Sequence, residues 1–212
     1  MKTNLIILIA MCGALALSAA ERSKPVRPLR LFDGKTFSGW EGDTNKTFRV
    51  QDGAIVGGSL KEKVPRNEFL CTTRMYTNFI LSLKFKLEGN GANGGVQIRT
   101  KRIPNHHEVS GYQADMGDPS WWGCLYDESR RNKVLAQSDM EKVNKVLKRD
   151  DWNEYVIRCE GKRIRLALNG IETVNYEETD PQIEEYGIIA VQIHGGPPSQ
   201  AWYKDITVEE LP

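Results

Sequence analysis

The segment Phe79-Ile80-Leu81-Ser82-Leu83-Lys84-Phe85-Lys86-Leu87 alternates apolar and polar residues, most regularly over its second half. Successive side chains of a β-strand point to opposite faces, so a period of two is typical of a strand with one buried face. The pattern predicts that Leu81, Leu83, Phe85 and Leu87 face the interior. The chain is therefore expected to contain a sheet with one face covered.

Three further segments share a second pattern: Val96-Gln97-Ile98-Arg99, Tyr112-Gln113-Ala114-Asp115 and Val191-Gln192-Ile193-His194. Each places a glutamine and an ionisable residue two positions apart, between apolar or aromatic residues. If the three strands lie side by side, they form a polar floor of Gln97, Arg99, Gln113, Asp115, Gln192 and His194. Such a floor suits a cleft that grips a polyhydroxylated ligand. The alternative is three half-exposed strands that carry glutamine by chance.

Short strands and tight turns recur along the rest of the chain. Asp52-Gly53 is a strong hairpin signal between two apolar runs, and Gly161-Lys162 separates two more. The long stretch 116–151 contains Ser138-Asp139-Met140-Glu141, which has the form of a helix capping box and predicts one short helix. These features predict an all-β protein, a jelly-roll β-sandwich with one short helix in a long loop.

The N-terminus has the pattern of a secretory signal peptide. Lys2 is followed by an apolar run, and Ser18-Ala19-Ala20 resembles a cleavage site. The run is too short for a stable membrane span, although an uncleaved anchor is the alternative. We therefore predict a signal peptide at 1–20, a linker at 21–30 and one domain at 31–211, with a periplasmic or secreted location and no membrane span after cleavage.

Composition excludes several classes of protein. A formal net charge of +1 lacks the basic excess of a nucleic-acid surface, and 40% hydrophobic residues suffice for a sizeable core. The cysteines beyond the signal, Cys71, Cys124 and Cys159, are too few for a disulfide framework. No cysteine and histidine spacing resembles a zinc site. The pair His106-His107 could bind a divalent metal, but a lone pair is weak evidence and solvent exposure is the preferred explanation. A divalent metal cofactor stays an open alternative.

Candidate catalytic residues combine acids, a base and guanidinium groups. Asp115 and Glu128 are candidate proton acceptors, and His194 could act as either base or acid near neutral pH. The arginines could hold a developing negative charge. The predicted catalytic set is Asp115, His194, Glu128, Arg99 and Arg131. The structural alternatives are an Asp115–Arg99 ion pair, a backbone-satisfied His194, and an arginine of the 130–131 pair bound to Asp127.

Amides and aromatic rings are the candidate substrate-binding groups. Amides bond to sugar hydroxyls, and tryptophan can stack on a sugar face, although it is also a common core residue. The predicted substrate-binding set is Gln97, Gln113, Gln192, Trp121, Trp122 and Tyr126.

An ordered series of short motifs is more specific than any one of them. The series is Leu31-Phe32-Asp33-Gly34-Lys35, Gly39-Trp40, Asn67-Glu68-Phe69-Leu70, Gly94-Gly95-Val96-Gln97-Ile98-Arg99, Gly111-Tyr112-Gln113-Ala114-Asp115, Leu125-Tyr126-Asp127-Glu128 and Gln192-Ile193-His194-Gly195-Gly196-Pro197. It resembles the 3-keto-disaccharide hydrolase (3-keto-glycoside hydrolase) domain family over nearly all of 31–211. The resemblance implies a fold similar to concanavalin A-like lectins and glucanases, a carbohydrate substrate ketonised at C3, and an upstream enzyme that oxidises the sugar there.

The chemistry of a C3 ketone fits the residues present. The ketone acidifies the C2 proton, so a base can remove it, the C1 substituent can leave by elimination, and water can add. This route does not need the paired carboxylates of an ordinary glycosidase, and the Glu-x-Asp-x-x-Glu strand typical of glucanases on this fold is absent. The prediction is an exported enzyme that cleaves 3-keto-glycosides. The alternative is a non-catalytic, lectin-like carbohydrate-binding module.

Overall fold

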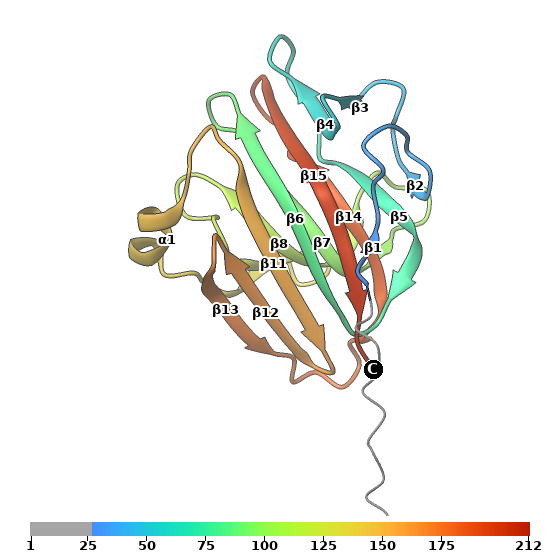
Figure 1. The fold of residues 1–212 in the computed structure, drawn as a ribbon, viewed down its shortest axis with the longest axis vertical. Helices are drawn as coiled ribbons and strands as arrows, with labels where there is room; N and C mark the ends of the chain where they lie inside the picture. The colour runs from blue at the N-terminus through green and yellow to red at the C-terminus, as the bar shows by residue number, and fades with distance from the viewer. Residues whose placement is uncertain (1–26) are drawn as a thin grey trace, which may run out of the picture.

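The computed structural model describes residues 27–212, so the predicted signal peptide and its cleavage site lie outside the described residues. Within that range the strands form two antiparallel sheets that pack face to face, which confirms the all-β sandwich. Figure 1 shows β6, β11 and β15 in the front layer and β7, β8 and β14 behind them. No helix in the described range is long and apolar enough to cross a membrane.

The first sheet carries the strand from which the fold was predicted. Its order is β13 (Ile171–Glu177), β12 (Arg163–Leu168), β11 (Asn153–Glu160), β6 (Phe79–Glu88), β15 (Ser199–Glu210), β4 (Ala54–Ser59) and β3 (Phe48–Gln51), with β1 (Leu29–Arg30) paired to β15. Leu81, Leu83, Phe85 and Leu87 of β6 are buried between the layers, as their alternation predicts. Strand β1 lies within the stretch predicted to be a linker.

The second sheet carries the three glutamine segments on adjacent strands. Its order is β10 (Lys133–Ala136), β9 (Leu125–Glu128), β8 (Val109–Gly117), β7 (Asn93–Arg102), β14 (Gly187–Ile193), β5 (Glu68–Tyr76) and β2 (Trp40–Glu41). Val96, Ile98, Ala114 and Val191 join the core between the sheets. Their glutamine neighbours therefore lie on the outer face of this sheet, because side chains alternate along each strand.

Helix α1 (Met140–Val146) lies in the predicted long loop, one residue later than the capping box implies. The N-cap is Asp139, whose side chain accepts bonds from the backbone of Glu141 and Lys142. Ser138 instead donates its hydroxyl to the Trp122 carbonyl, 2.6 Å away. Val143 is fully buried and attaches the helix to the core.

The three cysteines of the described chain are free thiols, and all are buried. Cys159 lies in the main core between the sheets, whereas Cys71 packs with Phe69 and Ala190 in a small cluster on the outer face of the second sheet. Burial raises the pKa of Cys71 and Cys159 to about 12. They are apolar packing residues.

Candidate functional site

A cleft of about 510 Å³ opens on the second sheet. Its lining combines two carboxyls, three side-chain amides, two aromatic rings and an imidazole. The lining residues are Asn67, Gly91, Asn93, Gln113, Asp115, Trp121, Tyr126, Glu128, His194 and Gly195. The two carboxyls come from strands β8 and β9, so a rigid sheet supports them, whereas Asn93 begins β7, Asn67 precedes β5 and His194 follows β14.

Strand register places the polar residues of the floor in two neighbouring rows. Gln97 lies directly opposite Gln113, whereas Asp115 and Gln192 flank Gly95 from either side. The glycine matters because a Cβ added there would lie 2.4 Å from Cδ of Gln113. Gln113 therefore extends into the space that a side chain at position 95 would fill. The predicted adjacency of the three glutamine strands is confirmed.

Asp115 is a buried carboxyl held by its own backbone. Its main chain bonds to that of Gly123 and Cys124, and the hydroxyl of Tyr155 donates to its carbonyl oxygen. Burial, with a smaller contribution from the charge of Glu128, raises the pKa of Asp115 to about 8 against the opposing bonds from Gln113 and the Met116 amide. Asp115 therefore keeps its proton at neutral pH.

Glu128 is the second carboxyl of the cleft, and it is buried as well. Burial raises its pKa to about 7, with contributions from the negative charges of Glu108 and Asp127, against a hydrogen bond from Gln192. A carboxyl with a pKa near 7 is partly ionised at neutral pH, which suits a general base. The cleft therefore contains one carboxyl ready to donate a proton and one ready to accept it.

Aromatic and imidazole groups complete the cleft. Trp121 and Tyr126 meet edge to face, with ring centroids 5.9 Å apart, and both rings are partly exposed. His194 is exposed, and its Nδ1 lies 2.6 Å from the carbonyl oxygen of Gly195. Because a carbonyl only accepts, Nδ1 carries the hydrogen and Nε2 remains the free acceptor of a neutral ring. His194 is thus both held by backbone and part of the cleft.

The placement predicted for Arg99 on the polar floor is wrong. A β-bulge interrupts β7 between Ile98 and Lys101, and Arg99 has a φ of 49°, so the two-residue alternation ends there. The buried guanidinium donates to the carbonyl oxygens of Thr77 and Gly161 and to the Asn78 side chain. Arg99 therefore ties together turns of the first sheet, and it neither reaches the cleft nor pairs with Asp115.

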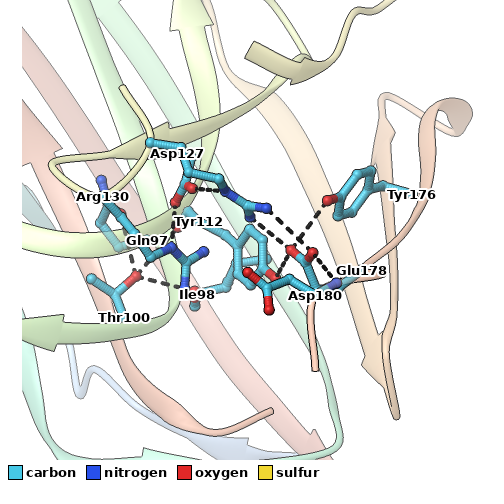
Figure 2. Close-up of polar contacts among 10 residues, drawn as sticks. Gln97, Ile98, Thr100, Tyr112, Asp127, Arg130, Tyr176, Glu178 and Asp180 are labelled. Carbon is cyan, nitrogen blue, oxygen red and sulfur yellow. Dashed lines mark hydrogen bonds and ion pairs between the residues drawn. The ribbon is translucent and has the colours of Figure 1, made fainter. Parts of the chain in front are cut away.

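Arg131, predicted to be catalytic, does not line the cleft, because it lies on the other face of the sheet. Asp127 faces the opposite side from its neighbours Tyr126 and Glu128, and both Arg130 and Arg131 bind it. Arg131 also bonds to Glu178, which accepts the hydroxyl of Tyr112 at 2.6 Å. We call Asp127, Arg130, Arg131, Glu178, Tyr112 and Tyr176 the edge ion cluster (Figure 2).

Three other predicted contacts are only partly found. Trp122 is a core residue that stacks on Phe85 and donates to Asp118, so it does not line the cleft. Gln97 and Gln192 lie on the floor but are fully buried, so they lie beneath the cleft and do not line it. Gln113, Trp121 and Tyr126 do line it.

Two amides of the cleft, Asn67 and Asn93, were not singled out from the sequence. Asn67 accepts the backbone N–H of Gly195 at its Oδ1, 2.9 Å away, which leaves its NH₂ group as a free donor. The motif Asn67-Glu68-Phe69-Leu70 was the available signal. Both residues precede or begin a strand, and only the fold brings them beside the carboxyls.

No group of three or more His, Cys, Asp or Glu residues within 27–212 lies close enough together to hold a metal ion. The rings of His106 and His107 stack on one another with centroids 4.4 Å apart, and Nδ1 of His107 contacts the Asn67 carbonyl. The pair therefore packs beside the cleft as a structural element.

Several solved structures share this fold, and some of them are described as carbohydrate-binding proteins or candidate glycosyl hydrolases. A candidate glycosyl hydrolase from Parabacteroides distasonis ATCC 8503 matches with a TM-score of 0.66 and 19% identity, covering 86% of this chain and 93% of its own. The carbohydrate-binding module CBM66 from Bacillus subtilis matches with a TM-score of 0.63 and 13% identity, over 81% and 96%. The carbohydrate recognition domain of Emp47p gives 0.56 and 12%, over 91% and 99%. No curated protein matches the chain significantly.

The family that the sequence matches indicates a glycoside hydrolase-like or carbohydrate-binding jelly-roll domain. The family is narrower than the fold. Residues 28–209 match the 3-keto-alpha-glucoside-1,2-lyase-like domain family, and the chain belongs to this family. The resemblance noted in the sequence is thereby confirmed.

Proposed function

We propose that this protein is an exported enzyme that cleaves 3-keto-glycosides by removing the C2 proton and eliminating the substituent at C1. The observation that carries the proposal is the pair of buried carboxyls, Asp115 and Glu128, whose pKa values are about 8 and about 7 in one cleft. Between those values one carboxyl is protonated and its partner is ionised. Elimination needs such a pair, because one group must accept a proton while another donates one.

Each cleft residue has a role in this reaction. The Glu128 carboxylate takes the C2 proton, and the electrons of that bond pass to the C3 oxygen as an enolate, next to the free NH₂ of Asn67. The enolate then collapses to a C1–C2 double bond as the C1–O bond breaks, and Asp115 protonates the leaving oxygen. Water adds across the double bond to give the free 3-keto sugar. The roles follow from the pKa order, which favours Glu128 over Asp115 as the base.

The remaining groups orient the sugar. Trp121 and Tyr126 provide an apolar edge against which a pyranose ring can pack. Nε2 of His194 can accept a sugar hydroxyl, and Gln113 offers an amide beside Asp115. The proposal also requires an enzyme that supplies the substrate by oxidising the sugar at C3.

The experiment is to incubate the protein with 3-keto-trehalose and, in parallel, with unmodified trehalose, in heavy water. The proposal expects release of glucose from the keto sugar alone, with deuterium at C2 of the keto product, because the reaction breaks and remakes that C–H bond. A reaction without protein corrects for spontaneous exchange at C2. Glucose release at full rate with hydrogen retained at C2 would show direct displacement at C1 and contradict elimination.

A non-catalytic binding module is the second candidate, supported by the similarity to CBM66. The same assay separates the two functions. Binding of the glycoside without release of glucose, in both keto and unmodified forms, would favour the module. Loss of activity in Glu128→Gln with binding retained would favour the enzyme.

A further inference from the structure

Two glutamines of the floor lie under the cleft carboxyls without lining the cleft. Gln97 and Gln192 are fully buried, so neither can serve as a primary contact for the sugar. Both are connected to a carboxyl through hydrogen bonds. Gln97 bonds to Gln113, which bonds to Asp115. Gln192 bonds directly to Glu128. The two arrangements differ in whether the amide is free to turn.

The amide beside Asp115 is locked. Nε2 of Gln97 donates to Oε1 of Gln113. Oε1 of Gln97 lies 3.3 Å from the Thr100 hydroxyl, which the carbonyl oxygens of Ile98 and Tyr112 also share (Figure 2). With its oxygen occupied, Gln113 can only present its NH₂ group to the Asp115 carboxyl. Turning the Gln113 amide would place two NH₂ groups against each other, and this would cost a buried hydrogen bond.

The amide beside Glu128 is not locked. Nε2 of Gln192 lies 3.3 Å from Oε2 of Glu128, whereas Oε1 of Gln192 is buried with no hydrogen-bond partner in the described chain. A half-turn of this amide exchanges the paired atom for the unpaired one, so the number of hydrogen bonds stays the same. Buried polar atoms without a partner are rare, and this one lies beside a group that gains and loses a proton.

We propose that Gln192 is a positioning residue whose amide turns with the protonation of Glu128. It donates from Nε2 to the carboxylate, and it accepts at Oε1 from the carboxylic acid. The Glu128 side chain thus keeps a hydrogen bond, and its place in the cleft, before and after it takes a proton. The proposal rests on the proposed function in treating Glu128 as the base.

The surroundings of Glu128 explain why an amide occupies this position. The titratable groups that influence it are acids: Glu108 from the loop before β8, Asp115 from β8, and Asp127 on the opposite face of its own strand, with the Tyr126 hydroxyl also nearby. Glu108 is itself engaged by the Ser129 hydroxyl. A cation here would hold Glu128 permanently ionised, whereas a neutral amide serves both protonation states.

The test uses two NMR titrations that need no substrate. In the wild-type protein, the ¹⁵N resonance of the Gln192 side-chain amide should shift along one titration curve with the midpoint of the Glu128 carboxyl ¹³C resonance. In Glu128→Gln the Gln192 resonance should stay constant with pH. Because turnover is not measured, failure of the proposed function leaves this result standing. A Gln192 resonance that ignores the Glu128 titration in the wild type would overturn the proposal.

The second measurement separates a turning amide from a fixed donor. Gln192→Met removes both polar atoms at similar size, with Gln97→Met as the matched control in the locked amide chain. If the amide turns, both forms of Glu128 lose a bond, so the Glu128 midpoint should move by less than about half a pH unit. A fixed donor stabilises the carboxylate alone, and its loss would raise the midpoint by about one unit or more, which would contradict turning. Gln97→Met should leave the Glu128 midpoint unchanged.

Discussion

At the scale of single residues, Asp115 and Glu128 are two carboxyls with different environments and different proposed roles. Asp115 is enclosed by backbone and by the locked Gln97–Gln113 amides, whereas Glu128 lies among other acids. Burial is the largest cause of both raised pKa values. The proposed elimination needs Glu128 ionised and Asp115 protonated, so its rate would depend on a single intermediate protonation state of the pair.

We predict a narrow bell-shaped dependence of kcat/KM on pH. The rate should rise as pH passes about 7, where Glu128 loses its proton, and fall as pH passes about 8, where Asp115 loses its own. Rate measurements with a 3-keto-glycoside between pH 5.5 and 9.5 check this. A flat profile across that range would exclude both carboxyls from the rate-determining step.

We further predict that Asp115→Asn and Glu128→Gln each lower kcat by about 100-fold or more, the usual loss for a general acid or base. Asp115→Asn should lose less with a substrate whose leaving group is already acidic, such as a nitrophenyl 3-keto-glucoside, because protonation of the leaving oxygen then matters little. His194→Ala should mainly raise KM if the imidazole orients the sugar. Equal losses in Asp115→Asn for both leaving groups would contradict its role as the acid.

At the scale of elements, one irregularity in β7 decides which predicted site residues reach the cleft. Gln97 follows the alternation and lies on the floor, but the bulge after Ile98 turns Arg99 away from it. Alternation alone does not show where a bulge interrupts it, and the sequence around Arg99 has no glycine to mark one. Tyr126 and Glu128 follow the alternation on β9, which also explains why Asp127 lies on the opposite face.

The strands themselves were predictable where one face is fully buried. Strand β6 alternates buried and exposed residues and was found in its predicted place. Strand β13 was missed because it is mostly exposed and has one buried residue, Val174, so it has little hydrophobic pattern. Strands β9 and β10 lie within the stretch 116–151 that the sequence predicts to be a long loop, because 4 residues give too little pattern to identify a strand. The cleft combines β8 with β9, and this pairing joins segments that no local pattern connects.

The edge ion cluster is predicted to stabilise the sandwich where β9 approaches the loop after β13. Burial would raise the pKa of Glu178, but bonds from Arg131 and Tyr112 outweigh burial and hold it at about 2. Arg131→Met leaves a buried carboxylate without its cation, so the free energy of unfolding should fall by about 3 kcal/mol. Urea denaturation checks this, with Arg163→Met, which breaks an exposed pair with Glu177, as the control expected to change little.

At the scale of the whole molecule, the cleft carboxyls reduce stability at high pH. Both pKa values are higher in the folded protein than the ordinary values of 3.8 and 4.5. Between the ordinary and raised values the folded state holds more protons than the unfolded state, so stability falls as pH rises. The loss begins above about pH 4 and is complete above about pH 8. The fold therefore carries a cost that the proposed chemistry explains.

We predict that Asp115→Asn and Glu128→Gln are more stable than the wild type at pH 8, by an amount on the order of a few kcal/mol for the more buried Asp115. At pH 3 the differences should nearly vanish, because that pH lies below the ordinary values of 3.8 and 4.5 and the carboxyls are then mostly protonated in both states. Urea midpoints at the two pH values check this. A variant that is less stable than the wild type at pH 8 would contradict the direction of the pKa shifts.

The three buried thiols can report the rates at which different parts of the molecule open to solvent. A protonated thiol inside the protein does not react with an alkylating reagent, so each cysteine is labelled only when its surroundings open. Cys71 packs on the face that carries the cleft, and Cys159 lies between the sheets. The carbonyl oxygen of Cys124 accepts a hydrogen bond from the backbone N–H of Asp115. The alkylation rates of Cys71 and Cys124 would measure local opening around the cleft. The alkylation rate of Cys159 would measure how often the two sheets separate. A bound sugar should slow the alkylation of Cys71 and Cys124 more than that of Cys159.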